Sequence, residues 1–167
     1  MHSPEASVRL GTLVLISSLA LVCARPVTAA VFNVTASGAA EIPPNNTTAT
    51  GSAVFTLDIA NASMTYTVTF SGLSGPLTGT HIHRLSGTGG GAPAIGLNPP
   101  LGATEATWSG TLTDLTAATI ADLLAGLYYL NIHSTEFPDG EIRGTLVLDP
   151  ETPVRPVSWG RIKALFR

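Results

Sequence analysis

The chain has 167 residues, a formal net charge of −3 and a single cysteine, Cys23. Its length fits one domain with additional segments at the ends. Residues 31–150 carry nine acidic and two basic residues, which gives this part a net charge of −7. So few cations cannot neutralise a run of phosphates, and the composition excludes a nucleic-acid-binding protein.

Residues 1–29 are predicted to be a secretory signal peptide. Arg9 supplies a positive charge, residues 10–23 are apolar but too short for a comfortable membrane span, and residues 27–30 offer small side chains for cleavage after Ala29 or Ala30. An uncleaved N-terminal anchor is the alternative. The leader predicts a secreted, periplasmic or cell-surface protein whose mature chain has no transmembrane span. Because cleavage removes Cys23, we expect the mature chain to have no disulfide.

Residues 30–149 are predicted to form one domain built mainly from strands. The pattern is clearest where Met64, Tyr66, Val68 and Phe70 alternate with threonines, as in a half-buried antiparallel strand. Strands are predicted by similar patterns at residues 31–37, 51–59, 64–70, 80–85, 105–112, 127–134 and 140–148.

One segment between the later strands has a helical period instead. Apolar residues favour a short helix over residues 114–125, with Thr116 or Asp114 as the N-cap and Gly126 as the stop. Residues 86–100, rich in Gly and Pro, are predicted to form a long surface loop. The predicted fold is all-β, an antiparallel β-sandwich or flattened barrel with one short helix between late strands. Its core is predicted to include Phe55, Leu57, Met64, Tyr66, Val68, Phe70, Leu130, Ile132, Leu146 and Leu148.

Residues 150–167 differ in composition from the domain. Pro150, Pro153 and Pro156 predict an extended linker, and residues 151–167 carry a net charge of +3. A short basic and aromatic tail of this kind is expected to contact an anionic surface or the export machinery. A disordered tail without a partner is the alternative.

Three histidines lie in two of the predicted strands. His81 and His83 are two residues apart on one strand, so their side chains share a face, and His133 lies on another. A sheet that brings these strands together would present three imidazoles to a zinc or copper ion. The alternative is a structural role in which each imidazole binds a backbone carbonyl. Acidic residues that are candidates for an oxygen ligand are Glu105, Glu136, Asp139 and Glu141.

Evidence for an enzyme is weak in this sequence. Glu141 and Arg143 share a face of a predicted strand, which favours a structural ion pair or a solvated face. No Gly-x-Ser-x-Gly elbow is present, and no cysteine remains after residue 23. Copper/zinc superoxide dismutase also uses a His-x-His strand, but its full ligand set is missing here. We therefore expect no enzymatic activity.

Six segments, taken in order, resemble the CHRD domain, which is named for its repeats in chordin. The resemblance spans residues 31–148 and implies an exported, mostly β domain without a settled activity. Chordin binds secreted growth factors, but that role does not extend to a single copy without cysteine-rich partner modules. The segments are residues 41–44 (Glu-Ile-Pro-Pro), 51–70, 79–83 (Gly-Thr-His-Ile-His), 115–126, 129–134 (Tyr-Leu-Asn-Ile-His-Ser) and 140–144 (Gly-Glu-Ile-Arg-Gly).

Two functions are compatible with these observations. The first is a non-enzymatic binding or structural module, outside the cell or at its surface, with a protein or surface ligand as partner. The second is a zinc- or copper-binding protein that uses His81, His83 and His133 and that is redox-active if the metal is copper.

Overall fold

The computed structural model describes residues 29–87 and 89–151. Apart from Ala29, the predicted signal peptide lies outside the described residues, as does the predicted tail beyond Glu151. Within the described part of the chain, no helix has the length and apolar character needed to cross a membrane.

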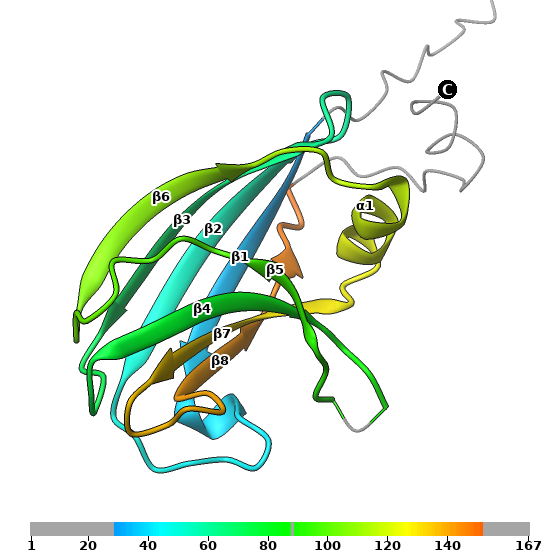
Figure 1. Cartoon of the computed structure of the whole chain (residues 1–167). Coiled ribbons are helices and arrows are strands. Elements are labelled where there is room, and N and C mark those ends of the chain that lie inside the picture. The colour runs from blue at the N-terminus through cyan, green and yellow to red at the C-terminus, as the bar shows by residue number, and fades with distance from the viewer. Residues whose placement is uncertain (1–28, 88, 152–167) are drawn as a thin grey trace, which may run out of the picture.

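Nine strands form a single antiparallel sheet that curls around the hydrophobic core (Figure 1). The order of the strands across the sheet is β5-β4-β7-β8-β1-β2-β3-β6, and β9 also pairs with β1. The predicted all-β antiparallel fold with one short helix is therefore confirmed. The strands are β1 (Ala29–Ser37), β2 (Thr50–Asp58), β3 (Ser63–Ser71), β4 (Leu77–Arg84), β5 (Pro93–Gly96), β6 (Ala106–Leu112), β7 (Tyr128–Ser134), β8 (Ile142–Thr145) and β9 (Val147–Leu148).

The threonine-rich half of the sheet follows the alternation in the sequence. In β3, Met64, Val68 and Phe70 are buried, and the threonines between them are exposed. On the exposed face, the Thr67 hydroxyl bonds the Ser109 hydroxyl of β6 at 2.8 Å. All the predicted core residues are buried except Leu148, which is only partly buried but packs against the core.

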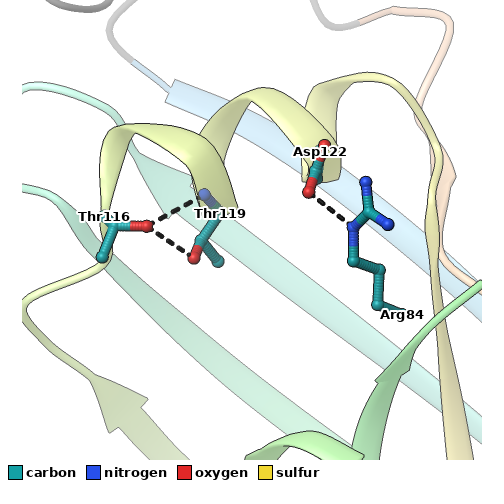
Figure 2. Close-up of polar contacts among 4 residues, drawn as sticks. All are labelled: Arg84, Thr116, Thr119 and Asp122. Atoms are coloured by element: carbon teal, nitrogen blue, oxygen red, sulfur yellow. Dashed lines mark hydrogen bonds and ion pairs between the residues drawn. The ribbon is translucent and has the colours of Figure 1, made fainter. Parts of the chain in front are cut away.

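Helix α1 (Ala117–Leu124) lies at one end of the curled sheet (Figure 1). Thr116 is its N-cap, as predicted, and its hydroxyl oxygen accepts a hydrogen bond from the Thr119 backbone N–H at 3.1 Å. Ile120 and Leu123 are fully buried, because they lie on the face turned to the core. An ion pair between Arg84 of β4 and Asp122 of the helix connects the two elements (Figure 2), and its atoms Nε and Oδ2 are 2.7 Å apart.

Two segment predictions differ from the structure. The predicted loop at residues 86–100 contains β5, a short edge strand that pairs with β4. The predicted strand at residues 140–148 is divided into β8, which lies between β7 and β1, and β9, which pairs with β1. Gly- and Pro-rich edge strands carry little alternation, so the pattern of the sequence does not reveal them.

Strand β7 is buried on both faces, and all seven of its residues are buried. It lies between β4 and β8, with Leu130 and Ile132 directed to the apolar core. Tyr129, Asn131 and His133 alternate with them and therefore point to the opposite face. This second face, which we call the polar face, also receives side chains of β4 and β8 through the pairing of the strands. The polar face consists of His81, His83, Tyr129, Asn131, His133 and Arg143.

Candidate metal centre

The structure brings His81, His83 and His133 together on the polar face. Their ring centroids are 5.0 Å apart for His81 and His133, 5.8 Å for His81 and His83, and 5.9 Å for His83 and His133. One ring nitrogen of each residue lies within 4.8 Å of the corresponding nitrogen of the other two. A small inward movement of the rings would place the three nitrogens around one ion, because Zn–N bonds are about 2.0–2.1 Å long.

Strand register and a glycine produce this arrangement. His133 is paired with Gly79, two residues before His81 on β4. A Cβ atom at Gly79 would lie 3.2 Å from Cε1 of His81. The His81 ring therefore lies over the space that a side chain at residue 79 would take, which brings it next to His133. His81 Nδ1 and His133 Nε2 are 3.2 Å apart.

Backbone carbonyls determine which nitrogens carry protons. His83 Nδ1 donates to the carbonyl oxygen of Gly91 at 2.8 Å, and His133 Nδ1 donates to that of Pro138 at 2.9 Å. A carbonyl oxygen only accepts, so each neutral ring carries its proton on Nδ1 and has a lone pair on Nε2. Metal-bound histidines are oriented by the same kind of second hydrogen bond.

The lone pair of His83 has no partner among the described residues. His83 is 6% exposed, and its Nε2 is buried without a hydrogen bond. In folded proteins most buried side-chain polar atoms have a hydrogen-bond partner, and an exception calls for an explanation. A metal ion between the three rings would satisfy this nitrogen.

Burial also favours the neutral form of two of the rings. Desolvation is the main cause that lowers the pKa of His133, and the nearby His81 and His83 lower it further. Desolvation, followed by the proximity of His83, lowers the pKa of His81. Because only neutral imidazole ligates a metal, both shifts keep the rings in the ligating form.

The amino-acid sequence matches the family model of the CHRD domain over residues 32–146, which is more than half of the chain. The chain belongs to the CHRD domain family. No curated protein matched in a search for similar sequences, and none of the solved structures matched either. The predicted resemblance to this family is therefore confirmed.

Two further residues of the CHRD domain support His83. The Tyr129 ring stacks on the His83 ring, with 5.0 Å between the ring centroids. Cζ of the Arg143 guanidinium lies over the Tyr129 ring, 3.5 Å from its centroid. Arg143 also donates to the carbonyl oxygen of Gly89. Tyr129 was not among the predicted site residues, although the alternation of Tyr129, Asn131 and His133 in one strand was a signal for a second buried face.

Glu141 and Arg143 of the CHRD domain do not have the predicted relationship. Both are buried, and they form no ion pair with each other, so the predictions of an ion pair and of a solvated face are wrong. Glu141 Oε1 accepts hydrogen bonds from Thr47 Oγ1 at 2.6 Å and from Ser74 N and Oγ, each at 2.8 Å. Burial alone would raise its pKa, but hydrogen bonds from Ser134, Thr47 and Ser74 lower it.

Within the described residues, the candidate metal-binding group of the CHRD domain contains no carboxylate. Glu141 uses one carboxylate oxygen in the hydrogen bonds described above. Asp139 lies close enough to His133 to influence its pKa, but it is exposed and outside the ligand group. The arrangement therefore offers three neutral nitrogen donors, a set that suits zinc or copper.

Proposed function

We propose that this CHRD domain is exported and acts as a non-enzymatic binding module outside the cell or at its surface. Support for export comes from the leader-like residues 1–29. Support for a binding role comes from the family and from the β-fold, whose one buried polar face carries a cluster of potential ligands.

Export is tested by expressing the full chain with its own N-terminus and a C-terminal epitope. The protein is expected in the medium, the periplasm or the surface fraction, and intact-mass analysis is expected to show that it begins at Ala30 or Val31. A control lacks the apolar residues 10–23 and should remain inside the cell. If the full chain also remains inside with its N-terminus intact, the proposal of export fails.

A second candidate function is binding of a zinc or copper ion by His81, His83 and His133. The observation that favours it is the convergence of three ring nitrogens, with the Nδ1 protons of His83 and His133 held by backbone carbonyls. Hydrogen bonds of this kind leave a lone pair on each Nε2. The Nε2 of His83 has no partner among the described residues, and the Nε2 of His133 accepts a hydrogen bond from His81 Nδ1 that a metal ion would replace.

Calorimetric titration of the metal-free full chain with Zn²⁺ and with Cu²⁺ tests this second function. We expect one saturable site per chain in the wild type. The His81→Ala/His83→Ala double variant should lose it, whereas a control variant such as Thr67→Ala, on the exposed face of β3, should retain it. Equal heats from the wild type and the double variant would end the metal hypothesis.

A further inference from the structure

The histidine cluster supplies fewer ligands than a closed metal site needs. Structural zinc sites are almost always four-coordinate, whereas sites with three protein ligands keep one position for water or another external ligand. Among the described residues, the group of potential ligands ends at His81, His83 and His133. Three ligands leave one coordination position of a tetrahedral ion unfilled.

The unfilled position has access to solvent on one side of the cluster. His83 and His133 are 6% and 8% exposed, so both are enclosed by the protein. His81 is only partly buried and is the most exposed of the three. An external molecule can therefore reach an ion at the cluster past His81 without displacing the two enclosed rings.

The charge around the cluster favours an anion. Three neutral imidazoles bring no negative charge to compensate a divalent ion. Among the described residues the buried cation is Arg143, whose guanidinium is separated from His83 by one stacked ring, that of Tyr129. Arg143 lies close enough to Glu41 to influence that carboxyl: burial raises the pKa of Glu41 to about 7, and Arg143 opposes the shift. Burying a charge costs free energy unless an opposite charge pairs with it. A divalent ion bound to the three neutral histidines would keep its positive charge, and an external anion would pair with it.

From these three observations, we propose that the metal-loaded cluster binds a small external anion at its open coordination position. This inference rests on the metal binding proposed above. The cluster then acts as a receptor for small anions in which the metal supplies the charge and the three histidines hold the metal.

Asp139 is the internal competitor for the same position. It acts electrostatically on His133, and it belongs to the loop that also contains Pro138, the acceptor of the His133 proton. Its side chain is exposed and lies outside the ligand group. The experiment therefore includes an Asp139→Asn variant, which removes the charge at nearly constant size.

The test uses the metal-free full chain loaded with Co²⁺, which stands in for Zn²⁺ and has a visible spectrum that depends on its coordination. The buffer contains no coordinating anion. Azide is titrated first as the spectroscopic probe, and acetate is then titrated as the carboxylate. We expect a saturable shift of the cobalt bands with each anion, in the wild type and in Asp139→Asn alike. The His81→Ala/His83→Ala variant should give no cobalt spectrum.

Each outcome decides a different question. If the cobalt spectrum of the wild type is absent, the anion site proposed here fails, and the metal-binding function fails with it when Zn²⁺ and Cu²⁺ also give no heat in the calorimetric titration. If the spectrum is present but neither anion changes it in either protein, metal binding stands and the open position is refuted. If only Asp139→Asn responds, Asp139 is the fourth ligand and the proposal is overturned. If azide shifts the bands but acetate does not, the position is open to the smaller anion, which supports the proposal.

Discussion

Glu141 shows how a buried charge is kept in this domain. Its side chain is fully buried, and the hydrogen bonds to Oε1 join residues 47 and 74 to the start of β8. Its backbone oxygen accepts a further bond from Asn45 Nδ2 at 2.9 Å. One residue therefore connects two loops to the sheet, which assigns the Gly-Glu-Ile-Arg-Gly segment a structural role.

Replacing Glu141 by Ala is expected to lower the free energy of unfolding by about 1.5–3 kcal/mol, because hydrogen bonds to a charged acceptor contribute in that range. The Ser74 N–H and the two hydroxyls would lose their buried acceptor. Urea denaturation followed by tryptophan fluorescence measures the change. Glu105→Ala, at an exposed position, is the control. Equal midpoints for the two variants would contradict the structural role.

Glu41 predicts a dependence of stability on pH. Burial raises the pKa of Glu41 from 4.5 to about 7 in the folded protein, although Arg143 opposes the shift. Between these two values the folded state holds a proton that the unfolded state has released. The contribution of protonated Glu41 to stability is therefore complete below pH 4.5 and is lost as the pH rises through about 7.

The matched variant for this prediction is Glu41→Gln, which is neutral at every pH. The unfolding free energy of the wild type minus that of Glu41→Gln should fall as the pH rises from 4.5 to 7. Denaturation curves at several pH values measure this difference. A difference that does not change across the window would show that Glu41 titrates with an ordinary pKa in the folded state.

At the scale of elements, β3 carries the alternation that the sequence shows best. Phe70 is 1% exposed, and its ring packs edge-on against that of Trp108 with 5.9 Å between the ring centroids. Trp108 belongs to β6, which pairs with β3 along its length. The contact therefore packs the outermost strand of this half of the sheet against the core.

Replacing Phe70 by Ala is expected to destabilise the domain by about 3–5 kcal/mol, which is typical of the loss of a large buried ring. Thermal or urea denaturation measures the loss. Thr69→Ala, on the exposed face of the same strand, should change stability far less. A loss below about 1 kcal/mol for Phe70→Ala would contradict its place in the core.

Elements also differ in how far the sequence predicts them. The predicted helix and seven predicted strand regions correspond to elements of the structure, because alternating or helical apolar positions fix which face is buried. Strand β5 was predicted as loop, since its four residues are half Gly and Pro. β5 pairs with the backbone N–H and C=O groups along the edge of β4, a longer strand. The sequence of the short segment alone does not reveal that this edge lies beside it.

At the scale of the whole molecule, the described sheet completes its hydrogen bonds before the C-terminal segment begins. The Asp149 backbone N–H donates to the Val31 carbonyl oxygen at 2.8 Å, which joins the end of the domain to β1. The sequence changes after this point to a proline-rich segment of opposite net charge. The domain is therefore expected to fold without the residues that follow.

Deleting residues 152–167 is expected to leave the melting temperature nearly unchanged, because the described residues that precede them already form the nine-stranded sheet and its core. Calorimetry on the full and truncated chains measures this. A control that also removes residues 147–151, and with them β9, should melt at a clearly lower temperature. A large drop on removal of residues 152–167 alone would show that this segment belongs to the fold.

The sequence by itself determined the all-β class, the main core residues, the helix and the family, and it narrowed the N-cap of the helix to Thr116 or Asp114. These features follow from local sequence patterns and from the order of the motifs along the chain, so they can be predicted without knowing which segments are neighbours in space. Only the tertiary structure decided that β7 is buried on both faces and that Glu141 and Arg143 have separate partners. It also decided that Tyr129 supports His83 and that two backbone carbonyls hold the Nδ1 protons of His83 and His133. The physical reason is that strand order and the paths of the loops, which a two-residue period does not encode, determine which segment covers the second face of a strand.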